Sequence, residues 1–166
     1  MFRQGDDMKW EQLCEDPALE NLPYRVELAR HGQLVMSPHR SYHSIFQSRI
    51  IRLLNQLLPE GEAMPECPIE TDLGTVVADV AWASPDKVRR NFDLPSWAES
   101  PEIVIEVLSP SNAAKEIRDK RAAVFARGAK EFWVCEEDGT LRFFGRRGRL
   151  AKSRLCPKFH GSVTTN

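Results

Sequence analysis

Hydrophobic and polar residues alternate in two short runs in the first quarter of the chain. The runs cover residues 24–28 and 33–37, and His31-Gly32 lies between them. Two alternating runs around a short glycine-containing stretch are typical of a β-hairpin. We therefore predict an N-terminal β-hairpin, and we interpret residues 1–22 before it as a loosely structured or short helical lead-in.

The spacing of apolar residues then changes to that of a helix. Between residues 41 and 58, apolar side chains recur at intervals of three and four positions, at Phe46, Ile50, Leu53, Leu54 and Leu57. This spacing places them on one face of an amphipathic helix. Pro59 and Gly61 follow and predict where the helix ends.

The remaining elements follow from apolar runs that are separated by turn-forming residues. β-branched and other apolar residues predict further strands at 64–70, 75–84, 102–108, 131–136 and 141–145. A helix is predicted over 113–127, because capping side chains precede it and Gly128 follows it. Residues 85–100 contain two prolines and predict a connecting loop, which is a candidate for a lid or a dimer contact.

This order of strands and helices predicts an α/β fold in which helices flank a mixed central β-sheet. The chain has 166 residues, which suits one domain with a substantial core, and we place that domain at 23–166. No apolar run approaches the roughly 20 residues of a membrane span, and residues 1–7 lack the features of a secretory signal. We therefore expect a cytoplasmic protein that is not bound to a membrane.

Charge narrows the partners that can be expected. The formal net charge is -1 at pH 7, so no global positive field marks the chain as a nucleic-acid coat protein. Basic residues nevertheless gather near the end, where residues 139–166 contain no acidic residue. A local nucleic-acid contact and a solvated basic face without a partner both fit this pattern. The four cysteines form no Cys-x-x-Cys pair, which argues against a structural zinc site.

Two acidic residues interrupt runs that otherwise resemble buried strands. Asp79 lies within residues 76–82 and Glu106 within residues 103–108, among valine, isoleucine, alanine and leucine. Burying an ionised carboxylate in such surroundings is costly unless a cation or a metal ion compensates its charge. Asp79 and Glu106 are therefore candidate site residues.

A lysine on the following helix adds a cation to this pair. Ile117, Lys120 and Val124 are three and four positions apart, so they share one helix face. Because that helix must pack its apolar face against the sheet, we expect Lys120 to point toward the strand that holds Glu106. Taken singly, each of these residues has an ordinary structural explanation, such as a salt-bridged acid or a surface lysine. Two acids and a lysine brought together indicate an active site more readily than a core.

These residues belong to a longer set of motifs. The motifs are Ala78-Asp79, the segment Ile105-Glu106-Val107-Leu108-Ser109-Pro110-Ser111, Lys120 with Gly128, Glu131-Phe132-Trp133-Val134, and the earlier Glu27-Leu28-x-x-x-Gly32-Gln33-Leu34-Val35-Met36 followed by His43. Over roughly residues 22–162 this set resembles the PD-(D/E)XK nuclease superfamily and, more narrowly, the Uma-type restriction endonuclease family.

The resemblance implies a restriction endonuclease-like fold and a role for each candidate. Asp79 and Glu106 would bind Mg²⁺ or Mn²⁺, and the backbone carbonyl of Val107 would be a further metal ligand. Hard cations prefer such oxygen ligands. Lys120 would orient or deprotonate the attacking water, because in this family the lysine lies on the helix and not at the strand position that Leu108 takes here.

The function implied is that of a metal-dependent DNA endonuclease, which hydrolyses phosphodiester bonds. Glu27 is a further candidate for the same site, whereas we interpret His43 as a polar residue near a helix start. A homodimer would be the simplest way to cut both strands of duplex DNA, because it has two sites related by a two-fold axis. Two alternatives stay open: a nuclease fold that serves only as a binding or regulatory module, and a metal-dependent hydrolase that acts on RNA or nucleotides.

Overall fold

One mixed β-sheet forms the centre of the molecule. The structure, a computed structural model, describes residues 9–20, 22, 24–38, 40–110 and 112–164. Its strands are β1 (Tyr24–Ala29), β2 (Gln33–Pro38), β3 (Glu62–Thr71), β4 (Gly74–Ala83), β5 (Ile103–Val107), β6 (Glu131–Cys135), β7 (Leu141–Gly145) and β8 (Gly148–Leu150). The sheet follows the order β2-β1-β4-β5-β6-β7-β8, and β3 pairs with β4 off this path.

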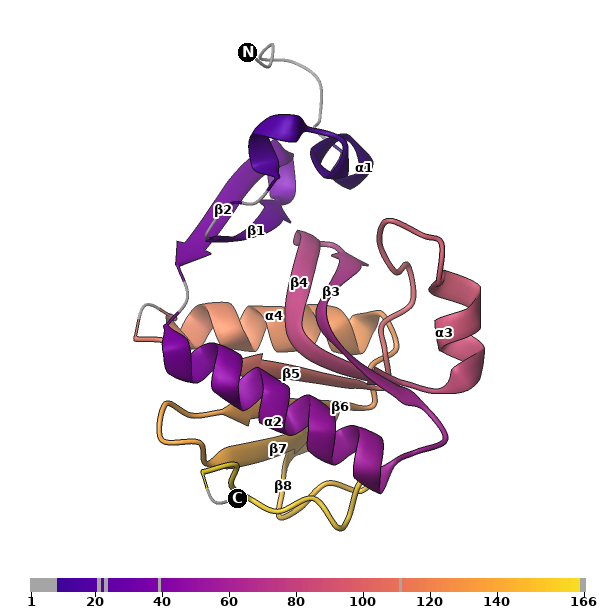
Figure 1. The fold of residues 1–166 in the computed structure, drawn as a ribbon, viewed down its shortest axis with the longest axis vertical. Coiled ribbons are helices and arrows are strands. Elements are labelled where there is room, and N and C mark those ends of the chain that lie inside the picture. Colours follow the sequence, from indigo (N-terminus) through magenta and orange to yellow (C-terminus); the bar gives the residue numbers. More distant parts are fainter. Residues whose placement is uncertain (1–8, 21, 23, 39, 111, 165–166) are drawn as a thin grey trace.

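Helices lie on both faces of the sheet (Figure 1). They are α1 (Trp10–Cys14), α2 (Ser41–Leu57), α3 (Pro85–Asn91) and α4 (Ala114–Ala126), with 3-10 turns η1 (Pro17–Leu19) and η2 (Arg30–Gly32). Alternate residues of β5 separate the two faces, because Ile103 and Ile105 pack in the core cluster of α2 whereas Val104 packs in that of α4. The predicted α/β fold with a mixed, helix-flanked sheet is therefore confirmed.

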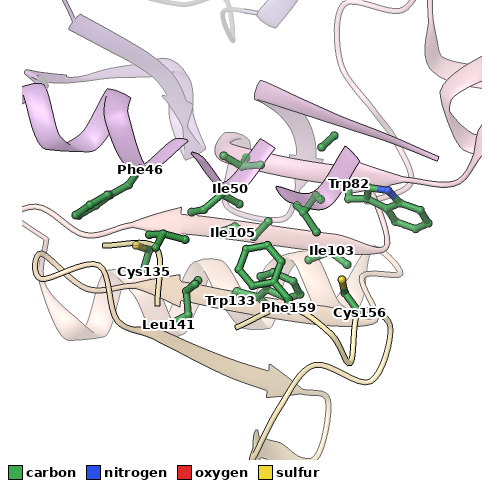
Figure 2. Close-up of a cluster of buried hydrophobic side chains, with 14 of the residues drawn as sticks. Phe46, Ile50, Trp82, Ile103, Ile105, Trp133, Cys135, Leu141, Cys156 and Phe159 are labelled. Carbon is green, nitrogen blue, oxygen red and sulfur yellow. The ribbon is translucent and has the colours of Figure 1, made fainter. Parts of the chain in front are cut away.

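The core cluster between α2 and the sheet explains the helical spacing seen in the sequence. Figure 2 shows this cluster, which includes Phe46, Ile50, Trp82, Ile103, Ile105 and Trp133. The apolar side chains that α2 buries are Phe46, Ile50 and Leu54, which are four positions apart. Full burial of a side chain of this size is worth about 1.5–3 kcal/mol. The predicted helix is thus held in place by its apolar face.

The β5–α4–β6 unit determines where the predicted lysine lies. β5 and β6 are parallel, with Glu106 opposite Val134. A parallel connection needs a crossover, and α4 supplies it. The helix ends just before Gly128, whose φ of 101° is a left-handed conformation that favours glycine. The crossover turns the buried face of α4, which includes Lys120, toward the strand that carries Glu106.

The hairpin of β1 and β2 extends away from the rest of the sheet (Figure 1), and its antiparallel pairing confirms the prediction from the sequence. β1 pairs with β4 through its last two residues, with Leu28 opposite Thr75 and Ala29 opposite Gly74. Gly74 has a φ of 107°, and a Cβ atom at this position would overlap the carbonyl oxygen of Leu28. Both the backbone conformation and the close approach of β1 therefore require glycine here.

The prediction for residues 85–100 was wrong in its first half, because those residues form α3 and not a loop. Pro85 takes the first helical position, where a missing N–H costs nothing, and Arg89 and Arg90 occupy the last turn, where cations are favourable. The proline that suggested a loop is therefore a helix start. The short strand β8 was not predicted either.

The expected lead-in is described in part. Residues 1–8 lie outside the described residues, and α1 and η1 follow them. Trp10 Nε1 donates a hydrogen bond of 2.9 Å to the carbonyl oxygen of Pro95, which ties α1 to the segment after α3. None of the helices in the described ranges is long and apolar enough to cross a membrane.

Candidate active site

The three predicted site residues meet where β4, β5 and α4 come together. Val80 of β4 pairs with Ile105 of β5, so Asp79 and Glu106, one position further along each strand, stand opposite each other. Residues in this relation have Cβ atoms about 5 Å apart. Lys120 reaches the pair from α4, with its Nζ 3.0 Å from Glu106 Oε2. Asp79, Glu106 and Lys120 are only 1%, 3% and 6% exposed.

Lys120 uses its full set of hydrogen-bond donors. Its Nζ donates to Glu27 Oε1 at 2.7 Å, to the carbonyl oxygen of Val77 at 2.8 Å and to Glu106 Oε2 at 3.0 Å. Three acceptors match the three protons of an ammonium group. Burial opposes the charge, but the Glu106 and Glu27 carboxylates outweigh it and raise the pKa of Lys120. Lys120 is therefore a buried cation, and Glu27 belongs to the same cluster, as predicted from its motif.

Asp79 is held as an anion. Its Oδ2 accepts a hydrogen bond of 2.7 Å from the backbone N–H of Val107 and lies 3.2 Å from His43 Nε2, while its Oδ1 pairs with Arg25. Burial acts against ionisation, but the His43 hydrogen bond and the Arg25 charge outweigh it and lower the pKa of Asp79 to about 2. Asp79 thus offers a negative oxygen pair inside the protein.

The pKa of Glu106 is shifted in the opposite direction to that of Asp79. Burial is the largest influence on this carboxyl group and, helped by the charge of Asp79, it exceeds the attraction of Lys120 and raises the pKa to about 7. Oε2 accepts from Lys120 and from Arg25 Nη2 at 3.3 Å. Oε1 is buried and has no hydrogen-bond partner among the described residues. An unpaired buried carboxylate oxygen is costly, so Glu106 has an unused capacity to bind a cation.

Arg25 was not assigned from the sequence, yet it lies at the centre of the cluster. It extends from β1, donates to Asp79 Oδ1, and lies 3.3 Å from Glu106 Oε2 and 3.5 Å from Glu27 Oε1. Burial disfavours its charge, but the Glu106, Asp79 and Glu27 carboxylates raise its pKa, so it stays a cation. The alternating pattern contained a signal for this residue: Arg25 is two positions before Glu27, and such residues share one face of a strand.

His43 lies near a helix start, as interpreted from the sequence, and it also belongs to the cluster. It lies in the first turn of α2, is buried, and contacts Asp79 through Nε2. Burial lowers its affinity for a proton, but Asp79 outweighs this and raises the pKa of His43. The motif that ends in His43 was the available signal.

The site opens on one side into a groove. Inside the cluster the free volume is only about 20 Å³. Beside it lies a volume of about 480 Å³, the side groove, whose lining includes Glu27 and Lys120 together with Val35 of β2, Leu73 and Val76. Lys120 and Glu27 therefore line both the cluster and the groove. The exposed Glu116 of α4 also lines both volumes.

A second concentration of charge lies at the other end of β6. A volume of about 540 Å³, the basic hollow, is lined by the cationic residues Lys130, Arg146, Arg147, Arg149 and Arg154. All five are exposed, and none forms an ion pair with another described residue. Glu131 also lines the hollow, three positions before Val134, which stands opposite Glu106. The hollow and the cluster are therefore roughly 10 Å apart along the strand direction.

Comparison with known proteins identifies the group to which this site belongs. The chain matches the model of the Uma2 family, described as "Putative restriction endonuclease", over residues 9–160. This protein belongs to the Uma2 family. Its fold is similar to a crystal structure of "a putative nuclease belonging to DUF820" from Anabaena variabilis, with a TM-score of 0.74, 15% sequence identity, and coverage of 94% of this chain and 95% of that one. No curated protein matches the chain significantly.

Membership of the Uma2 family confirms the resemblance drawn from the motifs and assigns the chain to a group of restriction endonuclease-like nucleases. Families of this type generally use divalent metal ions. In the described part of this Uma2 chain, no group of three or more histidine, cysteine or acidic side chains is arranged to hold a metal ion.

The donor atoms of this Uma2 protein nevertheless suit a hard cation. Asp79 and Glu106 face each other, and Glu106 Oε1 is buried without a hydrogen-bond partner among the described residues. Mg²⁺ is commonly held by one or two carboxylates and keeps several waters, so two carboxylates are a sufficient set. Val107, whose carbonyl was expected to be a ligand, donates its N–H to Asp79 Oδ2. That contact places Val107 beside the two acids.

Proposed function

We propose that this protein is a metal-dependent endonuclease that hydrolyses phosphodiester bonds in DNA, with Mg²⁺ or Mn²⁺ as the metal ion. The observation that carries the proposal is a pair of facing, buried carboxylates, Asp79 and Glu106, beside the buried ammonium of Lys120. Structural ion pairs balance their charges and their hydrogen bonds. This cluster leaves one oxygen of Glu106 in a buried position without a hydrogen-bond partner among the described residues, which is the expected state of a group that serves a ligand.

Each residue has a role that follows from its surroundings. Asp79 and Glu106 would hold the metal ion, with the backbone carbonyl of Val107 as a further ligand by resemblance to the family. The ion supplies charge neutralisation at the phosphodiester and lowers the pKa of a water molecule that attacks it. By resemblance to the family, Lys120 would orient the attacking water or a phosphate oxygen, which would take the place of one of its three present acceptors. Glu27 holds Lys120 in this position through the 2.7 Å contact.

The basic hollow supports nucleic acid as the substrate. Its cationic side chains form no ion pair with another described residue, so their charge is available to an anionic ligand. An exposed group of such cations suits the phosphates of a nucleic acid, whose backbone contacts carry much of the binding. We expect a homodimer when both strands are cut, because each protomer supplies one site.

The decisive experiment is cleavage of supercoiled and linear DNA with Mg²⁺ or Mn²⁺ and with EDTA. The wild type is compared with Glu106→Gln and Lys120→Met, and the matched control is Glu102→Gln, a buried acid outside the cluster that bonds to Ser84. We expect metal-dependent cutting by the wild type and the control, and a loss of at least roughly a hundredfold in both site variants.

Two other results would redirect the proposal. Cutting of RNA or release of products from nucleotides, with DNA left intact, would establish a metal-dependent hydrolase with another substrate. A well-folded wild type that binds DNA but cuts no nucleic acid with either metal ion would establish a binding or regulatory module. Circular dichroism of each variant separates these results from a failure to fold.

A further inference from the structure

Arg25 occupies the position between the carboxylates that a bound cation would be expected to take. Its guanidinium pairs with Asp79 Oδ1 and lies 3.3 Å from Glu106 Oε2, so it bridges the two proposed metal ligands. A third contact, at 3.5 Å, joins it to Glu27 Oε1. The free volume that remains inside the cluster is about 20 Å³, which is close to the space of one water molecule.

The charges of the cluster allow only one cation, either Arg25 or a metal ion, at this position. Glu27, Asp79 and Glu106 face the cations Arg25 and Lys120. With Arg25 in place, these cations almost balance the acids. A divalent ion added to the same position would bring two further positive charges against the guanidinium in a buried setting, where charge repulsion is poorly screened. Arg25 and a metal ion therefore compete for one position.

Arg25 is the more exposed of the two cations in the cluster, with 12% of its side chain exposed against 7% for Lys120. It lies on β1 three residues before Leu28, where the pairing of β1 with β4 begins. Its side chain is 12% exposed, whereas that of Asp79 is 1% exposed, so the guanidinium is the member of the pair nearest to solvent. Lys120, by contrast, is fixed by three acceptors and by its place in α4.

We propose that Arg25 is a tethered counter-cation that exchanges with the metal ion. Without the ion, the guanidinium bridges Asp79 and Glu106 and balances their charges. When the ion binds, Arg25 leaves the bridge and turns toward solvent, while Lys120 stays in place. This inference rests on the proposed function, because the ion in question is the one that we assign to Asp79 and Glu106. It makes Arg25 a positioning residue that sets the metal affinity of the site.

The test is a titration with Mn²⁺ in the absence of DNA, measured by calorimetry and by the electron paramagnetic resonance signal of free Mn²⁺. Arg25→Met removes the charge but keeps an elongated side chain. We expect its Mn²⁺ affinity to exceed that of the wild type by about tenfold or more, because no cation has to be displaced. We also expect the melting temperature of Arg25→Met in EDTA to be lower than that of the wild type, and Mn²⁺ should restore it.

Arg90→Met is the matched control, because Arg90 is an exposed arginine that is paired with Glu99. The Mn²⁺ affinity of this variant should equal that of the wild type.

A second variant covers the case in which Arg25→Met does not fold in EDTA. In Arg25→Lys, the cation is retained but cannot bridge two carboxylates with a planar fork, so Mn²⁺ should bind more tightly than to the wild type, by a smaller factor. Nuclear magnetic resonance gives a direct readout: the side-chain Nε–H signal of Arg25, assigned by its loss in Arg25→Lys, should shift as Mg²⁺ is added to the wild type.

The outcomes separate the exchange from the metal site itself. Equal or weaker Mn²⁺ binding by Arg25→Met and Arg25→Lys, with binding abolished in Asp79→Asn, would overturn the exchange and leave the metal site intact. Absence of Mn²⁺ binding in all variants would overturn both. An Arg25 signal that does not move while Mg²⁺ binds would also refute the exchange, whatever the cleavage assay shows.

Discussion

The carboxylate cluster and the basic hollow contain the same kinds of cation in opposite settings. Arg25 and Lys120 lie inside the protein, and each pairs with two or more carboxylates. Arg147 and Arg149 are exposed and form no ion pair with another described residue. Buried charges must be paired where they lie, whereas exposed ones are stabilised by water and stay available. Under the proposed function, the cluster would therefore take a small cation and the hollow a large anion.

The largest effect is expected from the acid that the cluster holds most strongly as an anion. Asp79→Asn keeps the size of the side chain but removes its charge, so the proposed metal ion would lose one of its two carboxylates. We expect DNA cleavage to fall roughly a thousandfold, in line with the loss of a key electrostatic group from an active site. Cleavage rates at saturating Mg²⁺ measure this. A rate within a few fold of the wild type would show that the cluster is structural, like an ordinary ion-pair network.

The next effect concerns the stability of the fold. Lys120→Met leaves Glu27 and Glu106 without their ammonium partner in a buried site, which should lower the free energy of unfolding by about 3–5 kcal/mol. Lys115 lies on the same helix, is 78% exposed and pairs with Asp119. Lys115→Met should therefore change stability by no more than about 1 kcal/mol. Urea unfolding of both variants compares a buried cation with an exposed one, and equal changes would contradict the distinction.

A moderate effect is expected from metal ions alone. Because binding to the native state adds stability, Mn²⁺ at about ten times its dissociation constant should raise the melting temperature by roughly 3–6 °C. Asp79→Ala should show no such rise. Thermal scans with and without EDTA would reveal it, and an equal rise in wild type and variant would assign the effect to a site elsewhere.

The smallest effect is expected at the basic hollow. Replacing Arg147 and Arg149 by glutamate in the inactive Glu106→Gln background should weaken DNA binding roughly tenfold and leave the melting temperature unchanged, because these exposed side chains have no ion-pair partner among the described residues. The salt dependence of binding should become shallower by about one unit of slope for each phosphate that the variant no longer neutralises. Arg89→Glu with Arg90→Glu is the control, since both arginines are exposed but already paired with acids. Equal weakening in the control would mean that the hollow has no special role.

The sequence predicted the elements whose patterns are local. The alternation at 24–28 and 33–37 identified the hairpin, and the spacing of Phe46, Ile50 and Leu54 identified α2. Lys120 was placed inward because it shares a helix face with Ile117 and Val124, a relation that needs no knowledge of the rest of the fold. These inferences depend only on residues close together in the chain.

The remainder depends on pairings between distant segments. That Asp79 stands opposite Glu106 follows from the register of β4 with β5, and the chain does not display a register. Arg25 enters the cluster because the hairpin is joined to β4. That joining rests on two residue pairs, Leu28 with Thr75 and Ala29 with Gly74. α3 was overlooked for another reason: Pro85 begins a helix as readily as it breaks one, and only the packing around it decides between the two.

Gly74 determines how closely the β1–β2 hairpin approaches β4, and therefore affects the proposed catalytic site. It is five positions from Asp79 along β4 and has no side chain to contribute to chemistry, yet the seating of the hairpin against β4 depends on the space that a Cβ atom would fill. Arg25 and Glu27 both lie on strand β1 of that hairpin. One added carbon atom would thus displace Arg25 and Glu27 together, and with them the contacts that these two residues make to Asp79 of β4, Glu106 of β5 and Lys120 of α4.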